Sequence, residues 1–381
     1  MIGGCAMQRQ EKIELLKSLI RIDSDDGNEL AVAELLATVL RAHGVEAHLD
    51  PYGDHRANLV AEIGHCQTDR VLAFSGHMDT VGQGDKPWHH EPLGAEIVGD
   101  LLYGRGAADM KSGLAAMVVA LIELKEEGRL PSGALRLLAT AGEELGTTGS
   151  HRLERAGLVE DVDALVVGEP TADHVVFAHS GSYSYRINAV MGLVHFINEE
   201  TRLFDDVAAD PVLGTLEHSV TLFNGGRQVN VIPDLATLEG NVRPTAVFDN
   251  HQVDARLKTL VDRINENTPF QLSLEVLFSL QPVVTPQTVP LVKLALAAAN
   301  ANYPRGERKL KVIHGATDAS VFTLHRPDLP VVILGADQWD CAHQVDEFTT
   351  ISGYLATIET YKQLATEFFK LSNGETLVGD N

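Results

Sequence analysis

Apolar positions along the chain follow two periods, one typical of helices and one of strands. From residue 9 to residue 43 they recur every three or four residues, which predicts amphipathic helices over 9–21 and 28–43. A later helix over 112–127 is apolar nearly all round and should be buried. Short apolar runs predict strands at 45–49, 58–63, 71–75, 134–140 and 163–167. Apolar strands that alternate with helices favour an α/β fold with a doubly wound, mostly parallel sheet.

The pattern changes near residue 179, which we interpret as a domain boundary. Residues 182–189 alternate between polar and apolar side chains, as a strand with one solvated face does. The elements predicted after it are a helix at 199–210, strands at 218–223 and 235–243, a helix at 250–266 and a strand at 271–279. This β-α-β-β-α-β order is that of a small ferredoxin-like unit.

The first pattern returns from Pro290, with residues 331–334 as a further buried strand. We therefore predict a discontinuous larger domain of residues 1–178 and 291–381, which is interrupted by an inserted α+β domain of residues 179–290. Two domains also fit the length of 381 residues, because this length exceeds that of an average single domain.

Charge and cysteine content narrow the classes of partner. With 53 acidic and 30 basic residues, the formal net charge is −23, which argues against nucleic acid and anionic membranes as partners. No apolar run reaches the roughly 18 residues of a membrane span, and the first residues lack the features of a signal peptide. Three irregularly spaced cysteines, Cys5, Cys66 and Cys341, indicate a reducing compartment rather than a disulfide framework. We therefore expect a cytoplasmic protein.

Metal-binding and acid–base side chains gather where the predicted strands end. These side chains are His77, Asp79, Glu143, Glu144, Glu169 and His343, and Asp109 precedes the buried helix. An α/β protein presents its chemistry at the carboxyl ends of its strands. Two histidines and several carboxylates are enough to hold two divalent metal ions and to leave a general base. This is the composition of a metal-assisted hydrolase.

Each motif also allows a plainer interpretation. His77 and Asp79 lie two residues apart and can point into one site, where Asp79 would orient a metal-bound imidazole, but they could equally form a surface turn. Asp109 could bridge two metals or only cap the following helix. Neighbouring side chains diverge, so one of Glu143 and Glu144 can bind metal while the other faces water, although solvated glutamate pairs are common. Four strand ends that carry ligand types favour the metal site.

The motifs resemble those of the dinuclear zinc exopeptidases, the family that includes aminoacylase, acetylornithine deacetylase and succinyl-diaminopimelate desuccinylase. They read Ser-Gly-His-Met-Asp, Gly-Arg-Gly-Ala-Ala-Asp-Met-Lys-Ser-Gly, Gly-Glu-Glu, Gly-Glu-Pro-Thr and Ala-His-Gln-Val-Asp-Glu. They occur in the family's order over essentially the whole chain.

The resemblance implies two divalent metal ions, zinc in the first place, with cobalt or manganese as alternatives. The implied ligands are His77, Asp109 and Glu169 for one metal, and Asp109, Glu144 and His343 for the other. Asp79 would stand behind His77, and Glu143 would act as the general base.

The resemblance also implies that the inserted domain is a lid that joins two copies into a homodimer. His195 would stabilise the oxyanion in the partner's site, and Asn230 would contact the substrate. Arg243 would grip the substrate carboxylate, a task that suits a bidentate guanidinium. Gly315 and Thr317 belong to a loop that would bind the substrate backbone. After His195 the chain reads Phe-Ile-Asn-Glu-Glu-Thr-Arg, where family members have small residues and a proline.

A small N-acyl amino acid is the substrate class that the family implies. Within the family, the motifs are most similar to the desuccinylases of Gram-positive bacteria. These split N-succinyl-LL-2,6-diaminopimelate into succinate and diaminopimelate, on the route to lysine and cell wall. The alternatives are an acetylornithine deacetylase or a broad aminoacylase or dipeptidase. A different class is a catalytically inactive binding protein on the same fold, and loss of Glu143 or a ligand, which is not seen here, would indicate it.

Overall fold

The computed structural model describes residues 7–25, 27–65, 70–129, 133–189, 192–228, 230–231, 233, 235–303, 306–336 and 339–371. Cys5 and Cys66 lie outside them. The chain forms two compact units. The first comprises Met1–Phe177, Thr285–Lys311 and Thr317–Asn381, and the second comprises Ala178–Val284 and Val312–Ala316. Within the described ranges, no helix combines the length and apolarity that crossing a membrane requires.

Three helices of the first unit form because their apolar residues share a face or a buried surface. α1 (Arg9–Ile20) and α2 (Glu29–Ala42) bury one face each, and α3 (Ser112–Glu127) buries every residue as far as Leu124. α3 ends at Gly128, whose φ of 62° is left-handed, a conformation that glycine adopts without steric cost. All three predicted helices are confirmed, with ends that differ from the prediction by at most one residue.

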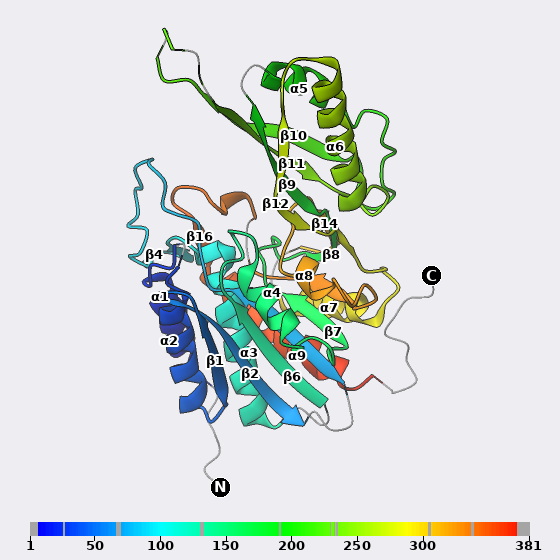
Figure 1. Ribbon diagram of the computed structural model, residues 1–381. Coiled ribbons are helices and arrows are strands. Elements are labelled where there is room, and N and C mark those ends of the chain that lie inside the picture. Colours follow the sequence, from blue (N-terminus) through cyan, green and yellow to red (C-terminus); the bar gives the residue numbers. More distant parts are fainter. Residues whose placement is uncertain are drawn as a thin grey trace. The chain divides into compact units, whose positions relative to one another are not determined.

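The first unit is built on a mixed sheet whose central strands are parallel (Figure 1). Its strands are β1 (Ala47–Tyr52), β2 (Arg56–His65), β3 (Val71–His77), β6 (Gly133–Thr140), β7 (Ala164–Val167), β8 (Val175–His179) and β15 (Val331–Ile333). Their order is β1-β2-β6-β3-β7-β15-β8. The pairings among β6, β3, β7 and β15 are parallel, whereas β1–β2, β2–β6 and β15–β8 are antiparallel. The predicted α/β fold with a mostly parallel central sheet is confirmed.

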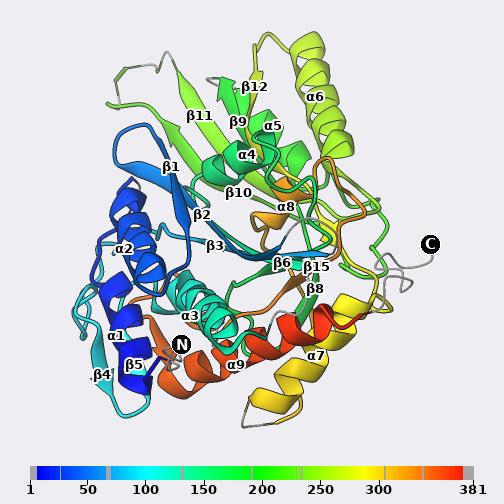
Figure 2. The ribbon, with the colours of Figure 1, turned by 90° about the horizontal axis from the view of Figure 1, so that it is seen from below.

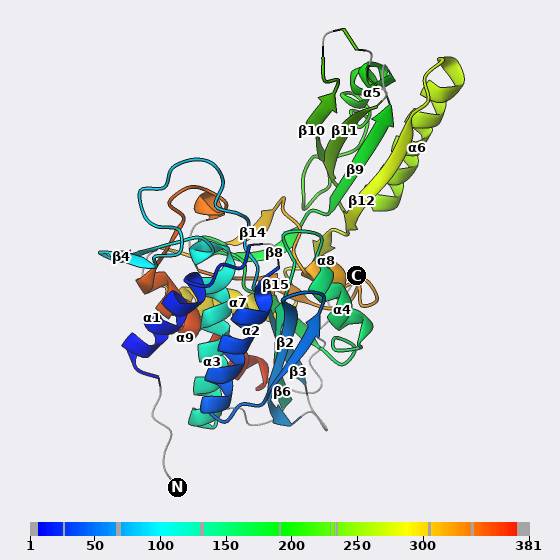
Figure 3. The same ribbon diagram turned by 60° about the vertical axis from the view of Figure 1, so that its left-hand side comes forward.

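Helices cover both faces of this sheet. α2, α3 and α9 (Ile351–Phe368) lie on one face, and α4 (Thr148–Arg155) lies on the other (Figures 2 and 3). As a result, β3, β6 and β7 are buried along their whole length. Strands covered on both faces read as continuous apolar runs rather than as an alternation, which is how they appear in the sequence.

The first unit also contains several smaller elements. β4 (Glu96–Val98), β5 (Leu101–Tyr103) and β16 (Phe348–Thr350) form a separate three-stranded sheet. The short helix η1 (Ala107–Lys111) follows β5 and runs into α3. Three further helical segments are α7 (Pro290–Asn302), α8 (Ala319–Phe322) and η2 (Trp339–Cys341).

The second unit has the predicted ferredoxin-like order. Its elements are β9 (Ser182–Ala189), α5 (Gly192–Glu200), β10 (Glu217–Gly225), β11 (Ala236–Arg243), α6 (Asn250–Asn267) and β12 (Ser273–Leu280). The strands pair antiparallel in the order β10-β11-β9-β12. Residues of β9, β11, α5 and α6 share one hydrophobic core. The last residues of β8 belong to this unit and pair with β13 (Val283–Val284), and β14 (Leu310–Ile313) also pairs with β8.

One element of this unit lies elsewhere than predicted. The helix expected over 199–210 is wrong, because α5 spans Gly192–Glu200 and the chain from 201 to 206 forms turns. Leu193 and Phe196 are buried at helical spacing in the core of this unit, so the apolar face that anchors the helix lies earlier in the sequence. Glu200 is also buried and accepts a hydrogen bond from Tyr185 Oη at 3.2 Å.

Removal of the buried Glu123 carboxylate should destabilise the first unit. Glu123 of α3 lies 2.8 Å from Lys12 Nζ and 2.8 Å from Lys362 Nζ. Because its loss leaves two cations without their buried partner, we expect Glu123→Ala to lower the free energy of unfolding by about 3 kcal/mol. Urea denaturation followed by tryptophan fluorescence reports on this unit, since Trp88 and Trp339 both lie in it.

The matched control is Glu359→Ala. Glu359 lies 3.4 Å from the same Lys362 amine, but it is about half exposed. This change should alter the stability by no more than about 0.5 kcal/mol. Equal effects of the two substitutions would contradict the proposed importance of burial.

Candidate metal centre and active site

The carboxyl ends of adjacent parallel strands bring the predicted residues to one edge of the sheet. The last residue of β3, His77, pairs in register with Thr140, the last residue of β6. Ser75 of β3 pairs with Val167, the last residue of β7. The turns after these strands therefore start side by side, at the edge where α/β proteins place their ligands. These turns carry His77, Asp79, Glu143, Glu144 and Glu169.

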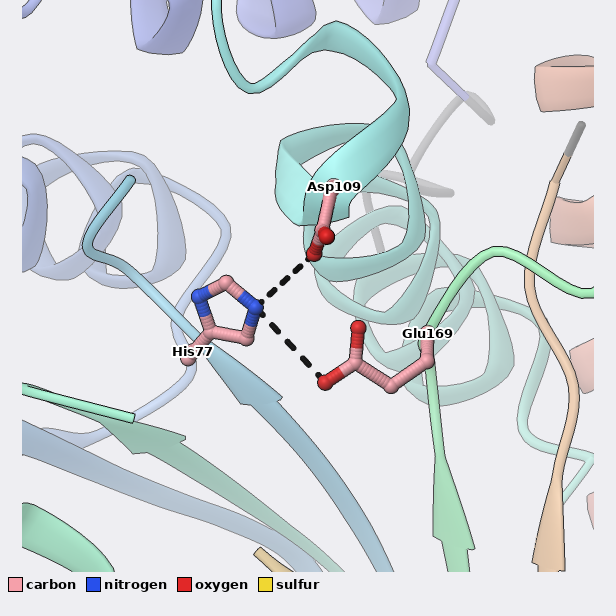
Figure 4. A group of neighbouring side chains, drawn as sticks. All are labelled: His77, Asp109 and Glu169. Carbon is pink, nitrogen blue, oxygen red and sulfur yellow. Dashed lines mark hydrogen bonds and ion pairs between the residues drawn. The ribbon is translucent and has the colours of Figure 1, made fainter. Parts of the chain in front are cut away.

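His77, Asp109 and Glu169 form a buried group of three side chains that converge on one point (Figure 4). The Nε2 atom of His77 lies 3.1 Å from Oδ1 of Asp109 and 3.6 Å from Oε1 of Glu169. Two protein ligands on one tetrahedral zinc ion lie about 3.3 Å apart at ordinary bond lengths. One nitrogen and two carboxylate oxygens at this spacing therefore fit a divalent metal ion.

Asp109, Glu144 and His343 form a second group, and Asp109 belongs to both. The Nε2 atom of His343 lies 2.9 Å from Oε1 of Glu144 and 3.2 Å from Oδ2 of Asp109. The His343 side chain is 48% exposed, so this group faces solvent more than the first does. Asp109 thus turns one oxygen towards each histidine, which is the arrangement of a carboxylate that bridges two metal ions.

The helix-cap interpretation of Asp109 is wrong. Asp109 lies in η1, whereas the N-cap residue of α3 is Lys111. No side chain in the described part of the chain caps the first turn of α3. Because Asp109 makes its side-chain contacts with the two histidines, its role lies in the site rather than in the helix end.

The carboxylate of Asp79 holds the turn that carries the two glutamates. Its Oδ1 atom accepts hydrogen bonds from the backbone N–H groups of Gly142 at 2.9 Å and Glu143 at 3.1 Å. Its Oδ2 atom accepts one from Glu144 at 3.1 Å. His77 Nδ1 lies 3.0 Å from the Asp79 carbonyl oxygen and 3.6 Å from the carboxylate. Asp79 therefore supports His77 through its backbone and the Gly142–Glu144 turn through its side chain.

Ionisable side chains lie close together in the two groups. Burial by itself lowers the pKa of His77, but the carboxylates of Glu169 and Asp109 raise it well above its usual value. Hydrogen bonds to Asp109 and Glu144 raise the pKa of His343 to about 10. Burial, together with the nearby Asp109 carboxylate, raises the pKa of Glu169 to about 8. Buried carboxylates this close repel one another, so the cluster favours a divalent cation, for which such oxygen and imidazole ligands are suited.

Glu143 belongs to neither group of three ligands. It is half-buried and lies in the turn that Asp79 holds. Burial raises the pKa of Glu143 well above its usual value, and the negative charges of Glu169 and Asp318 add to this effect. A carboxylate with a raised pKa is a stronger base, which suits proton transfer near neutral pH.

The predicted substrate-binding residues are divided between the two units. His195 lies on α5 and is exposed, with its ring 5.3 Å from that of Phe270. Asn230 is exposed, and Gly315 is half-buried, both in the second unit. The last residue of β11, Arg243, is half-buried. Thr317 lies in the first unit, where it is buried and its Oγ1 accepts a hydrogen bond from the backbone N–H of Ala319.

Two buried acids beside the site have no role in the sequence analysis. Asp318 accepts a hydrogen bond from the hydroxyl of Thr140, at the end of β6. Glu347 accepts one from the backbone N–H of Asp109. Each lies within four residues of a predicted site residue, and Glu347 is also the last residue of the Ala-His-Gln-Val-Asp-Glu motif. Burial of an acid inside a loop cannot be inferred from its neighbours along the chain.

The chain matches known proteins over most of its length. The family described as peptidase family M20/M25/M40 matches residues 73–367. A protein of Staphylococcus aureus strain MRSA252, named probable succinyl-diaminopimelate desuccinylase, is 31% identical, over 95% of this chain and 98% of its own.

Two solved structures share the fold. The M20 family metallo-carboxypeptidase of Sulfolobus solfataricus has a TM-score of 0.78 at 19% identity and covers 96% of this chain and 100% of its own. A dinuclear metal-binding peptidase of the M20 family from Bacillus subtilis has a TM-score of 0.70 at 16% identity. The match covers 95% of this chain and 98% of that protein.

Replacement of the Asp79 carboxylate should weaken metal binding without unfolding the chain. Asp79→Asn keeps the size of the side chain. Its N–H₂ group replaces one carboxylate oxygen, however, and cannot accept the backbone hydrogen bonds that this oxygen accepts. We expect a 10–100-fold loss of zinc affinity, the usual consequence of disturbing groups that orient metal ligands. Isothermal titration of metal-depleted protein with zinc chloride measures it. Asp85→Asn, an exposed acid after the same strand, is the control, and equal zinc affinities of the two variants would contradict the role of Asp79.

Proposed function

The chain belongs to peptidase family M20/M25/M40 and is a metal-dependent amide hydrolase, and from this premise we propose that it is a succinyl-diaminopimelate desuccinylase. The proposed reaction splits N-succinyl-LL-2,6-diaminopimelate with water into succinate and LL-2,6-diaminopimelate. For the chemistry, the observation that carries the proposal is the pair of ligand groups that share Asp109, with Glu143 beside them. For the substrate, it is the near full-length similarity to the staphylococcal protein of that name.

We assign the ligands by the two groups of side chains. One metal ion would be held by His77, Asp109 and Glu169, and the other by Asp109, Glu144 and His343. Zinc is our first choice, because mixed nitrogen and oxygen ligands with an open position are typical of catalytic zinc. Cobalt and manganese bind similar ligands and are the alternatives. Divalent ions bound there would supply the Lewis acidity that activates water and polarises the amide carbonyl.

Glu143 is the proposed general base and acid. Its carboxylate takes a proton from the attacking water while the water oxygen bonds to the amide carbon. It then gives this proton to the amide nitrogen as the carbon–nitrogen bond breaks, so that the amine leaves and the acyl group becomes a carboxylic acid, which passes its own proton to the amine or to solvent and ends as a carboxylate. Burial of Glu143 and its raised pKa support both halves of this exchange.

Arg243 is the proposed partner of a substrate carboxylate. Its Nη1 atom donates to Ser182 Oγ at 3.3 Å, and within the described ranges it forms no ion pair. Burial lowers the pKa of Arg243, and the charge of Glu217, which lies opposite it in the pairing of β10 with β11, offsets this only in part. A planar carboxylate would offset this cost through two parallel hydrogen bonds.

We further propose that the second unit is a lid and joins two copies of the chain. β10 is an edge strand of its sheet and exposes Leu222 and Phe223, whose burial by a second copy would be favourable. His195 would then act in the partner's site, while Asn230, Gly315 and Thr317 contact substrate in their own. Sedimentation equilibrium should give twice the chain mass of 41.2 kDa, and a monomer at micromolar concentration would contradict this arrangement.

The reaction should depend on both metal and Glu143. Removal of metal with a chelator should abolish hydrolysis of succinyl-diaminopimelate, and added zinc should restore it. Glu143→Gln should lower kcat by about 10²–10⁴-fold while two metal ions stay bound, because only the proton carrier is lost. Full turnover after complete metal removal would overturn the mechanism.

Faster hydrolysis of acetylornithine than of succinyl-diaminopimelate would overturn the substrate assignment alone, and tight binding without turnover would indicate a binding protein.

Arg243 should matter for substrate affinity more than for turnover. Arg243→Ala should raise KM about 10–100-fold with a smaller change in kcat, because the charged hydrogen bonds to the substrate carboxylate are lost. Arg186→Ala is the matched control on the same sheet, since Arg186 already pairs with Glu239 and Glu275. If a substrate amidated at that carboxylate still distinguishes wild-type from Arg243→Ala, the assignment of Arg243 is wrong.

A further inference from the structure

The Glu347 carboxylate is buried and fully enclosed by hydrogen-bond donors of a distant segment. Its Oε1 atom accepts from the backbone N–H groups of Ala108 at 2.9 Å and Asp109 at 3.0 Å. Its Oε2 atom accepts from the backbone N–H of Gly106 at 3.1 Å and from Arg105 Nη1 at 2.7 Å. Hydrogen bonds to an ionised acceptor are stronger than those between neutral groups. One side chain thus anchors most of the segment that ends at Asp109.

The same two segments are joined by further bonds around Glu347. The backbone N–H of Gly104 donates to the Glu347 carbonyl oxygen at 2.9 Å. Arg105 Nη1 also donates to the Gln344 carbonyl oxygen at 3.3 Å. Directly beyond, Tyr103 of β5 pairs with Phe348 of β16. We call this set, formed by the side chains of Glu347 and Arg105 with the backbone of residues 104–109, the Glu347 clamp.

The clamp connects two proposed metal ligands that come from opposite ends of the chain. Asp109 is the last residue that the clamp anchors on one side, and His343 lies four residues before Glu347 on the other. His343 has a φ of 61°, a left-handed conformation that a non-glycine residue adopts only when its surroundings stabilise it. Its side chain is half exposed, so packing gives it little support. The loop is therefore held mainly by hydrogen bonds of its polar residues, and those of Glu347 are the ones that lead to the backbone of Asp109.

His77 and Glu169, in contrast, do not depend on the clamp. Both are buried, and they lie at or directly after the ends of β3 and β7, which pair with each other in the central sheet. Their positions follow from strand pairing. The two ligand groups are thus supported in different ways, although they share Asp109.

We propose that Glu347 is a positioning residue that fixes Asp109 relative to His343 and so sets the affinity of the metal position formed by Asp109, Glu144 and His343. The inference rests on the proposed metal site, and it extends that site to a residue that touches neither metal nor substrate. It requires that loss of the clamp weakens one metal position much more than the other.

The test is zinc binding by the metal-depleted full chain with Glu347→Gln. Glutamine keeps the size of the side chain but has one acceptor oxygen, so its N–H₂ group must face Arg105 or backbone N–H donors. We expect the weaker of two zinc sites to lose 10–100-fold in affinity, and the tighter site to change less than threefold. After dialysis at limiting zinc, metal analysis should therefore give one zinc per chain for the variant and two for wild-type.

Two further variants separate positioning from general stability. Arg105→Lys keeps a cation beside Glu347 but loses the fork that reaches both Glu347 and Gln344, and it should weaken the same zinc site to a smaller degree. Asp346→Asn is the matched control, because the Asp346 carboxylate accepts hydrogen bonds from the backbone of His89 and His90, outside the clamp. It should leave both zinc affinities within twofold of wild-type.

The outcomes distinguish this inference from the proposed function. If wild-type binds fewer than two zinc ions, the metal site itself is wrong. If wild-type binds two, and Glu347→Gln either binds both as tightly or loses both in parallel with a lowered Tm, Glu347 is only structural and the inference is overturned. Should Glu347→Gln fail to fold, the same comparison of Arg105→Lys with Asp346→Asn decides it by the same criterion.

Discussion

The carboxylate of Asp109 is the point on which the site depends. Its two oxygens lie 3.1 Å from His77 Nε2 and 3.2 Å from His343 Nε2, so a single side chain sets the spacing of the two ligand groups. These residues come from the first third and the last tenth of the chain. A rigid sheet and an anchored loop are needed to hold them at hydrogen-bonding distance, because an error of one ångström would spoil metal coordination and catalysis alike.

Repulsion among buried carboxylates gives this arrangement its chemistry. Glu169 and Glu143 both have raised pKa values, first through burial and then through the negative charges around them. The cost of keeping such groups together is offset by cations, which in this family are metal ions. The same crowding supports the proposed roles of Glu169 as a metal ligand and of Glu143 as the general base.

The two units have different proposed roles in the reaction. In the first unit, parallel strands present the proposed metal ligands and the proposed base Glu143, so we assign the class of reaction to this unit. The second unit carries Arg243, a half-buried cation that forms no ion pair in the described part of the chain. A carboxylate on the substrate is the proposed partner of this cation.

Much of the fold and of the candidate site could be predicted from the sequence, for a physical reason. α3 as far as Leu124 and the central strands are mostly apolar because they are buried, and such runs are visible without a structure. The ligand motifs are short and directly follow those strands, so their meeting at one edge follows from parallel pairing. The family follows from the same motifs.

The start of α5 and the partners of the buried polar groups were decided by tertiary structure alone. α5 begins at Gly192 because Leu193 and Phe196 reach the core of the second unit, a contact that no local period reveals. The Asp79 carboxylate accepts hydrogen bonds from the Gly142–Glu144 turn, while its backbone carbonyl oxygen lies next to His77 Nδ1. Glu347 is buried against Asp109 although the two are far apart in sequence. Periodicity and motifs depend on neighbours along the chain, whereas the partner of a buried polar group depends on which distant segment packs against it.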